Sequence, residues 1–268
     1  MIFDTHAHYD DKAFDEDREE LLASMKENGI GRIVNIGSDI DSTKRSVKLA
    51  QDYDFIYAAA GVHPSEVKRM NKESFAWLAE VVNDDVYKKA SGGKIVAVGE
   101  IGLDYYWDKE TEVREEQKKW FEWQMELARA VGLPIVIHSR EAAKDTLDMV
   151  KSLHGGDIGG VMHCFSYPKE MAREYLNMGF YLGIGGVLTF QNARVLKEVA
   201  AYAPLEQIVL ETDCPYLSPV PNRGRRNSSL NLPYVVKALA DIRHISEQEV
   251  IDITNQNAKR LYRIQQGT

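Results

Sequence analysis

Residues 95–138 read IVAVGEIGLDYYWDKETEVREEQKKWFEWQMELARAVGLPIVIH, and this stretch decides the expected fold. It begins and ends with short apolar runs, Ile95–Glu100 and Pro134–His138, that are rich in Val and Ile and too short for helices. Between them, apolar residues recur at helical spacing from Trp120 to Val131, and Gly132 is expected to end that helix. The stretch therefore predicts a strand, a helix and a second strand.

The same pattern of a short apolar run followed by a longer amphipathic stretch recurs along the chain. Such runs are typical of strands that are buried on both faces. The expected strands are Ile2–His6, Arg32–Gly37, Phe55–Gly61, Ile95–Glu100, Pro134–His138, Gly160–His163, Phe180–Gly185 and Ile208–Asp213. Alternation of strands and helices implies a parallel sheet with right-handed crossovers. Eight units in about 250 residues predict an α/β fold, a (β/α)8 TIM barrel forming a single domain over residues 1–268, with an open doubly wound sheet as the alternative.

Composition excludes several classes of protein. The chain has 268 residues, of which 44% are hydrophobic and 28% are charged, so a disordered or fibrous chain is excluded. No apolar run reaches the roughly 18 residues of a membrane span, and the first residues do not read as a secretory signal. The two cysteines, Cys164 and Cys214, form no disulfide framework, and we expect reduced, buried thiols in a cytoplasmic protein. No obligate protein partner is evident.

Histidines and carboxylates stand where five of the eight expected strands end. A single histidine beside an apolar strand is usually a hydrogen-bonded core residue, but in a barrel all these strand ends meet at one rim. In His6-Ala7-His8 the two imidazoles share one face of a strand, because successive side chains alternate. The candidate metal ligands are His6, His8, Glu100, His138, His163 and Asp213.

These ligand types indicate the cofactor. Imidazole and carboxylate suit zinc, manganese, iron or nickel, and magnesium also binds carboxylates. Six ligands are too many for one four-coordinate zinc that keeps an open position. We therefore expect two divalent metal ions, about 3.5–4 Å apart, that share a carboxylate and activate water. His63 ends a further strand, and it is a seventh ligand, a donor to a substrate phosphate or a proton shuttle.

As a set, the motifs at the strand ends are specific. The chain resembles the TatD-like metal-dependent deoxyribonucleases, within the wider amidohydrolase-type barrels. The stretches that carry the resemblance are FDTHAHYD at 3–10, GVHP at 61–64, VGEIGLDYYWD at 98–108, LPIVIHSREA at 133–142, MHCFS at 162–166, ETDCPYLSP at 211–219 and NAKRLY at 257–262. They occur in the order of the family and cover nearly the whole chain.

The resemblance implies a (β/α)8 barrel with a two-metal site, and it assigns the ligands. One metal would be held by His6, His8 and Asp213, the other by His138 and His163, and Glu100 would bridge the two. The histidine that matches His63 lies at the substrate phosphate in the family. The family's Arg-Gly-x-x-Asn loop is matched by residues 223–227, but relatives usually continue with Glu-Pro where this chain has Ser228-Ser229.

The resulting hypothesis is a metal-dependent hydrolase, a deoxyribonuclease that cleaves DNA phosphodiester bonds from strand ends. Asp213 is the expected general base, and Glu100 and His63 complete the catalytic set. A net charge of −8 argues against a long duplex footprint and favours short or single-stranded DNA ends. The candidate substrate-binding residues are His63, Arg140, Arg223, Arg225 and Tyr105.

Two alternatives stay open. The same metals could hydrolyse a D-aminoacyl-tRNA ester or a small amide or ester, and the arginines would suit tRNA as well as DNA. A barrel that binds metal or a partner without catalysis is the third reading, and the complete ligand set argues against it.

Overall fold

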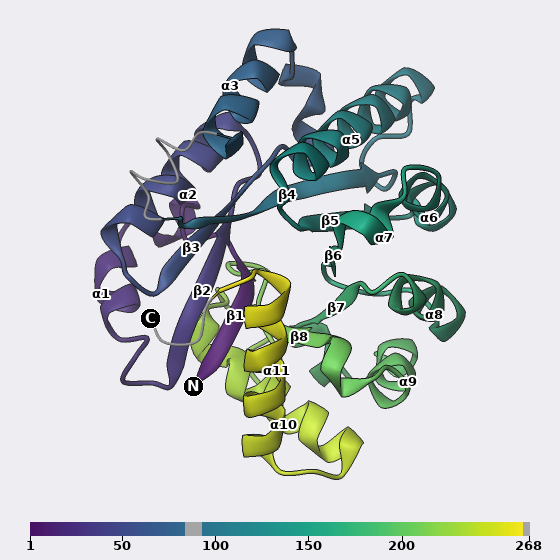
Figure 1. Cartoon of the computed structure of the whole chain (residues 1–268). Helices are drawn as coiled ribbons and strands as arrows, with labels where there is room; N and C mark the ends of the chain where they lie inside the picture. The colour runs from purple at the N-terminus through teal and green to yellow at the C-terminus, as the bar shows by residue number, and fades with distance from the viewer. Residues whose placement is uncertain (84–92, 265–268) are drawn as a thin grey trace. The chain divides into compact units, whose positions relative to one another are not determined.

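The protein is described from a computed structural model, in which residues 1–83 and 93–264 are described. The chain divides into two compact units, and each is described by itself. The first unit comprises Met1–Asn35, Cys164–Asn177 and Tyr181–Thr268. The second comprises Ile36–His163 and Met178–Phe180. Strands and helices alternate along the chain in both units (Figure 1).

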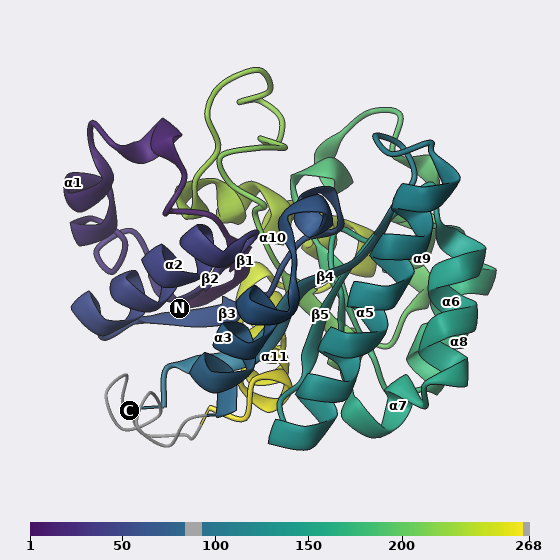
Figure 2. The same ribbon diagram turned by 90° about the horizontal axis from the view of Figure 1, so that it is seen from above.

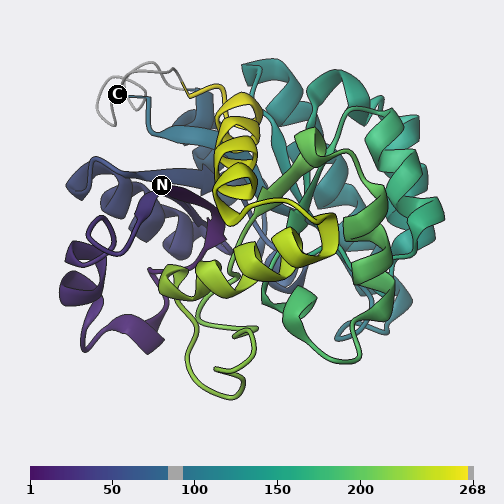
Figure 3. The ribbon, with the colours of Figure 1, turned by 90° about the horizontal axis from the view of Figure 1, so that it is seen from below.

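The described part of the first unit contains four strands. They are β1 (Ile2–Ala7), β2 (Ile30–Ile36, whose last residue falls in the second unit), β7 (Tyr181–Ile184) and β8 (Ile208–Leu210). Its helices are α1 (Arg18–Ala23), α8 (Lys169–Asn177), α9 (Arg194–Tyr202), α10 (Leu232–Arg243) and α11 (Glu247–Leu261). Short 3-10 turns are η1 (Lys12–Phe14), η3 (Gly186–Thr189), η4 (Leu205–Gln207) and η5 (Ser229–Asn231). Figure 3 shows α10 and α11 following each other as a pair.

The second unit contains the remaining strands. They are β3 (Ile56–Ala60), β4 (Ile95–Asp104), β5 (Ile135–Arg140) and β6 (Gly160–Met162). Its helices are α2 (Ile40–Asp52), α3 (Lys72–Asn83), α5 (Thr111–Val131), α6 (Ala143–Ser152) and α7 (Gly155–Ile158), with the 3-10 turn η2 (Pro64–Arg69). Helix α5 packs against β4 (Figure 2).

Strand order follows chain order, and the strands pair in parallel. In the first unit β1 pairs with β2 and β7 pairs with β8, and an isolated parallel bridge joins Ala7 to Cys214. In the second unit β3, β4, β5 and β6 pair in succession. A doubly wound sheet would reverse its strand order at a switch point, and within the described residues neither unit shows such a reversal.

Local signals in the sequence explain where several elements end. Gly132 caps α5 in the left-handed conformation, with φ of 70°, as the glycine predicted. Ser246 begins α11, and its hydroxyl accepts a hydrogen bond from the backbone N–H of Glu249 at 3.1 Å, as the capping pattern predicted. These predictions are confirmed because each depends on residues that are neighbours in the sequence.

Two strand ends differ from the predictions by three residues or more, and the others differ by one or two. Strand β4 was expected to end at Glu100 but continues to Asp104, and β8 was expected to reach Asp213 but ends at Leu210. The extension of β4 requires Gly102, whose φ is 142°, because a Cβ atom there would lie 2.0 Å from the carbonyl oxygen of His138. Asp213 lies beyond β8 in a left-handed conformation with φ of 57°.

The strands of each unit are lined by buried aliphatic side chains, in agreement with the apolar runs of the sequence. No helix within the described residues combines the length and apolarity needed to cross a membrane.

Candidate metal centre

A buried carboxylate in the second unit is surrounded by three imidazoles. Glu100, on β4, is 4% exposed, and its Oε1 lies 2.9 Å from Nδ1 of His138. The same oxygen lies 3.7 Å from Nε2 of His163 and 3.8 Å from Nε2 of His63. Three predicted site residues therefore gather around a fourth, and we call this set the Glu100 cluster.

The strands explain this arrangement. Adjacent parallel strands bring β4 beside β5, which carries His138, and β5 beside β6, which His163 follows directly. The backbone N–H of His163 donates to the carbonyl of Ile137 at 3.0 Å, so it continues the ladder. His63 follows β3 and begins the turn η2. The cluster thus gathers side chains from consecutive strand ends, as the predicted barrel required.

His138 lies between two carboxylates. Its Nδ1 faces Glu100, and its Nε2 lies 3.1 Å from Oδ2 of Asp104. Burial lowers the pKa of His138, but its hydrogen bonds to Asp104 and Glu100 outweigh burial and raise the pKa above the ordinary value. A neutral imidazole has one nitrogen without a proton, and only that nitrogen can bind a metal ion. If Nε2 of His138 carries the proton and donates it to Asp104, Nδ1 would be available to hold a metal ion.

Asp104 is a member of this cluster that was not predicted, although the sequence carries a signal for it. Asp104 lies four residues after Glu100, and even spacing places both side chains on one face of an extended strand. Burial raises the pKa of Asp104, but hydrogen bonds from His138 and from two backbone amides outweigh burial and lower the pKa. Ligand atoms of His63, Asp104 and His138 all lie within 4.8 Å of one another.

The orientation of His63 is set by its own turn. Its Nδ1 accepts a hydrogen bond from the backbone N–H of Ser65 at 3.1 Å and lies 2.8 Å from the hydroxyl of Ser65. A neutral ring whose Nδ1 accepts carries its proton on Nε2. His63 can therefore donate from Nε2, the nitrogen on the side of Glu100.

The first unit holds a second group of predicted ligands, which we call the Asp213 cluster. Nε2 of His6 lies 3.2 Å from Nε2 of His8. Oδ1 of Asp213 lies 3.7 Å from the first nitrogen and 3.4 Å from the second. His6, on β1, and His8, just after β1, therefore lie side by side, and Asp213 joins them from the loop after β8. Its side chain is 19% exposed, so it is partly open to solvent.

A buried carboxylate supports the Asp213 cluster from behind. Oδ2 of Asp4 accepts from the hydroxyls of Ser229 at 2.6 Å and Thr212 at 2.7 Å. Oδ1 accepts from the backbone N–H of Thr212 at 3.0 Å and of His6 at 3.2 Å. Burial raises the pKa of Asp4 to about 7, and these hydrogen bonds oppose that rise.

Ser229 gives the departure from the family pattern a structural account. Its backbone N–H donates to the hydroxyl of Tyr9 at 2.8 Å, and its own hydroxyl lies 2.8 Å from the same oxygen. A proline at position 229 could form neither contact. The preceding Asn227 donates to the carbonyls of Thr212 at 3.0 Å and Tyr216 at 2.7 Å, which ties the loop to the segment after β8.

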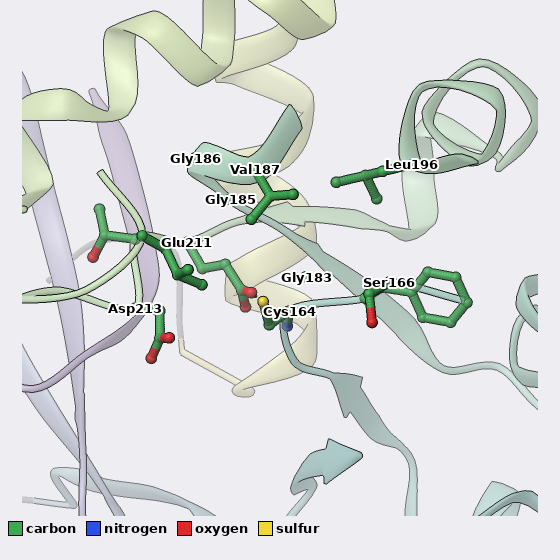
Figure 4. Close-up of a pocket in the computed structure, with 12 residues that line it drawn as sticks. Cys164, Ser166, Gly183, Gly185, Gly186, Val187, Leu196, Glu211 and Asp213 are labelled. Atoms are coloured by element: carbon green, nitrogen blue, oxygen red, sulfur yellow. Dashed lines mark hydrogen bonds between the residues drawn. The ribbon is translucent and has the colours of Figure 1, made fainter. Parts of the chain in front are cut away.

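Figure 4 shows the residues that line a small pocket in the first unit. Its acidic side carries Asp213 and the buried Glu211, whose Oε1 accepts from the backbone N–H of Cys164 at 2.6 Å. Gly183 is needed beside Glu211, because a Cβ atom there would lie 2.1 Å from Oε2. Apolar groups, including Val187 and Leu196, line the other side.

The two cysteines differ. Cys214 is buried, as predicted, and burial raises the pKa of its thiol well above the ordinary value. Cys164 is half-buried and lines the pocket, so the prediction that both are buried packing residues is wrong for this one. Neither cysteine forms a disulfide bond.

The predicted substrate-binding residues are spread over both units. In the second, Arg140 ends β5 and its guanidinium lies 3.8 Å from the ring centroid of Tyr106. Tyr105 is 9% exposed and its hydroxyl donates to Asp145 at 2.9 Å, so the structure does not favour it for contact with substrate.

The basic loop of the first unit is drawn as a long excursion after β8 (Figure 2). Arg223 and Arg225 are exposed, and Arg223 lies over the ring of Phe190 at 4.0 Å. Arg226 is engaged differently, because both of its terminal nitrogens contact the carboxylate of Asp17.

Known proteins match this chain over almost its whole length. The sequence profile of the family described as TatD related DNase matches residues 3–263. YabD of Bacillus subtilis (strain 168), named an uncharacterized metal-dependent hydrolase, is 42% identical over 264 residues, which are 98% of this chain and 100% of that protein. YcfH of Escherichia coli (strain K12), with the same description, is 30% identical over 267 residues, 98% of this chain and 96% of that protein.

Solved structures agree with these relatives. The crystal structure of YjjV, a TatD homolog from Escherichia coli K12, has a TM-score of 0.89 and 28% identity and covers 98% of each chain. With the eight parallel strands and alternating helices, this match confirms the predicted (β/α)8 TIM barrel as the fold class. The single domain over residues 1–268 stays a prediction. The chain belongs to the TatD family of metal-dependent hydrolases.

Proposed function

We propose that this hydrolase cleaves phosphodiester bonds at the ends of DNA strands, with two divalent metal ions as cofactors. The Glu100 cluster carries the proposal. A carboxylate that is 4% exposed and surrounded by imidazole nitrogens within 3.8 Å is a donor set suited to a divalent cation. The name of the matching family, TatD related DNase, supports DNA as the substrate.

The ligands divide between the two clusters. In our proposal His138 and His163 hold one ion together with Glu100, while His6, His8 and Asp213 hold the other. A carboxylate bridge through Glu100 remains a prediction from ligand count and family resemblance. When bound, the ions supply a water of lowered pKa and neutralise negative charge on the phosphate.

Three side chains of the chain itself would manage protons and charge. Asp213, partly exposed beside two imidazoles, would accept the proton of the attacking water. His63, with its proton on Nε2, would donate to a phosphate oxygen as negative charge develops there. Glu100 would keep two cations close by offsetting their repulsion.

The charged surface favours a short substrate segment. At a net charge of −8 a long duplex would be repelled, while local guanidinium groups bind phosphate oxygens in pairs. Arg140, Arg223 and Arg225 remain our candidates for these phosphate contacts. The exposed positions of the latter two support this assignment.

The test is hydrolysis of single-stranded DNA labelled at the 5′ or the 3′ end. Protein stripped by a chelator is compared with protein restored with zinc, manganese, magnesium, iron or nickel. We expect no cleavage by the stripped protein, recovery with at least one metal, and stepwise shortening from one end. The Asp213→Asn variant, loaded with the same metal, controls for a contaminating nuclease.

Metal-independent cleavage, or no cleavage with any metal, would contradict the proposal. A D-aminoacyl-tRNA and a small ester are assayed in parallel. Turnover of either without cleavage of DNA would replace DNA as the substrate while leaving the metal chemistry in place.

A further inference from the structure

The turn that follows β4 carries an aromatic side chain that is largely exposed to solvent. Trp107 is 67% exposed and Tyr106 is 40% exposed, whereas the adjacent Tyr105 is buried. The other three tryptophans of the chain are buried or half-buried. A single exposed apolar side chain is common on protein surfaces, so a role for Trp107 depends on the groups that surround it.

This turn is held rigidly. Oδ1 of Asp104 accepts from the backbone N–H of Tyr106 at 2.9 Å and of Trp107 at 3.2 Å. The side-chain amide of Gln117, on α5, accepts from the backbone N–H of Asp104 and donates to its carbonyl, at 3.0 and 3.1 Å. The exposed ring is therefore mounted on a fixed backbone and loses little conformational entropy on binding.

A cation completes the surface. The guanidinium of Arg140 lies 3.8 Å from the ring centroid of Tyr106 and 5.6 Å from that of Trp107. The two rings are 4.7 Å apart and nearly perpendicular. A flat aromatic face beside a positive charge matches a nucleobase and its neighbouring phosphate.

The surface is joined to the Glu100 cluster through one carboxylate. While Oδ1 of Asp104 holds the turn, its Oδ2 lies 3.1 Å from Nε2 of His138. Arg140 lies two residues after His138 on the same strand. A nucleotide whose phosphate reaches the cluster would therefore place a neighbouring base near Trp107.

We propose that Trp107, Tyr106 and Arg140 form a stacking subsite for an unpaired base at the end of a DNA strand, next to the phosphate that is cleaved. This inference rests on the proposed function and names the part of the substrate that is recognised. A base inside a duplex has both faces covered, so the subsite selects frayed or single-stranded ends. Stacking alone does not distinguish the four bases.

The experiment measures binding of short DNA strands to metal-loaded protein. The probes are a six-nucleotide adenine strand with phosphorothioate linkages that resist hydrolysis, and the same strand with an abasic residue at its 5′ or its 3′ end. Wild-type protein should bind one of the two abasic strands about 5- to 150-fold more weakly than the intact strand, as expected for one stacked base. Trp107→Ala should bind the intact strand that weakly and show no further weakening on that abasic strand.

Matched variants separate stacking from folding. Trp107→Phe keeps a flat ring and should bind within about threefold of wild type, while the tryptophan fluorescence change on binding disappears. Tyr234→Ala removes a tyrosine on α10 that is 40% exposed, as Tyr106 is. This variant should bind every strand with wild-type affinity.

Two outcomes would overturn the subsite: wild-type affinity of Trp107→Ala for the intact strand, or an equal loss on the intact and both abasic strands. The proposed function fails separately. If wild-type protein binds strands in a base-dependent way but cleaves no DNA with any metal, the subsite stands and the deoxyribonuclease assignment falls.

Discussion

The two ligand clusters are supported in different ways. In the Glu100 cluster, support reaches the imidazole rings themselves: Asp104 contacts Nε2 of His138, and Ser65 donates to Nδ1 of His63. In the Asp213 cluster, the buried Asp4 accepts from the backbone N–H of His6 rather than from its ring. A hydrogen bond to an imidazole ring determines which ring nitrogen carries the proton. A hydrogen bond to the backbone fixes the position of the strand and not the protonation of the ring.

This difference predicts separable effects. Changes behind the Glu100 cluster should alter metal affinity and turnover with little loss of folding stability. Changes behind the Asp213 cluster should destabilise the fold and leave the affinity of the folded protein nearly intact. Variants of the residues in and behind each cluster test this contrast.

Glu100→Gln preserves size and removes the charge at the centre of its cluster. We expect turnover to fall by about 10³-fold or more, because the electrostatic term is usually the largest in such sites. Metal content after equilibrium dialysis, measured by mass spectrometry, should fall by two ions if Glu100 bridges. Loss of one ion would limit Glu100 to its own cluster, and wild-type content would remove it from the site.

Asp104→Asn and Asp4→Asn form the sharpest pair. In the first variant the new amide donates to Nε2 of His138, so the ring proton moves to Nδ1, the nitrogen that faces Glu100. Metal affinity should fall about 10- to 100-fold, the usual cost of losing such a partner.

In Asp4→Asn, backbone and hydroxyl donors lose an acceptor inside the first unit, and the free energy of unfolding should fall by about 1–3 kcal/mol. Metal affinity of the folded variant should stay close to wild type. Both variants are measured by urea unfolding and by metal titration. Equal changes in both quantities for both variants would abolish the contrast.

Ser229→Pro introduces the residue that relatives usually carry at this position. It tests how much the hydrogen bonds of Ser229 with Asp4 and Tyr9 stabilise the fold. Ser228 is extended, with φ of −158° and ψ of 167°, so a following proline is sterically allowed. The destabilisation then comes from removing the hydrogen bonds to Tyr9 and Asp4, and we expect about 2 kcal/mol less stability in urea unfolding.

The control is Ser228→Ala, which keeps the hydrogen bond from the backbone N–H of residue 228 to Oδ1 of Asn227 at 2.9 Å. Its free energy of unfolding should stay within about 0.5 kcal/mol of the wild-type value. If Ser229→Pro is as stable as wild type, the network contributes nothing that the proline cannot replace.

The smallest effect asks whether the first unit also binds substrate. Arg223→Ala with Arg225→Ala should raise KM for a short DNA strand about tenfold and flatten its salt dependence by roughly one unit of slope for each phosphate that the variant no longer binds. Arg226→Ala is the matched control from the same loop, because Arg226 already contacts Asp17. Superimposable salt series for all three proteins would leave the loop without a role in phosphate binding.

The sequence predicted that each strand forms better than it predicted where each strand ends. The pattern of apolar runs placed Glu100 and Asp213 at two strand ends, but β4 continues to Asp104 and β8 stops at Leu210. Strand length depends on pairing with a neighbour, and Gly102 allows β4 to follow β5 closely for four more residues. Hydropathy does not capture that pairing.

The aromatic turn shows the same limit. The sequence made Tyr105 a candidate for substrate binding but did not show which side chain of residues 105–107 faces solvent. Tyr105 turns inward because Asp145, forty residues away on α6, accepts its hydroxyl. The Lys118 ammonium lies 3.0 Å from the same carboxylate and fixes that inward position.

The features that follow from the sequence alone are local: the alternation of strands and helices, the caps at Gly132 and Ser246, and the imidazoles and carboxylates near strand ends. These depend on the chemistry of neighbouring residues and on the two-residue period of a strand. Three other features follow only from tertiary contacts: Nδ1 of His138 faces Glu100, Ser229 is buried against Asp4, and Trp107 is largely exposed to solvent. Each of these depends on contacts between segments that are distant in the chain and become neighbours only when the strands pair.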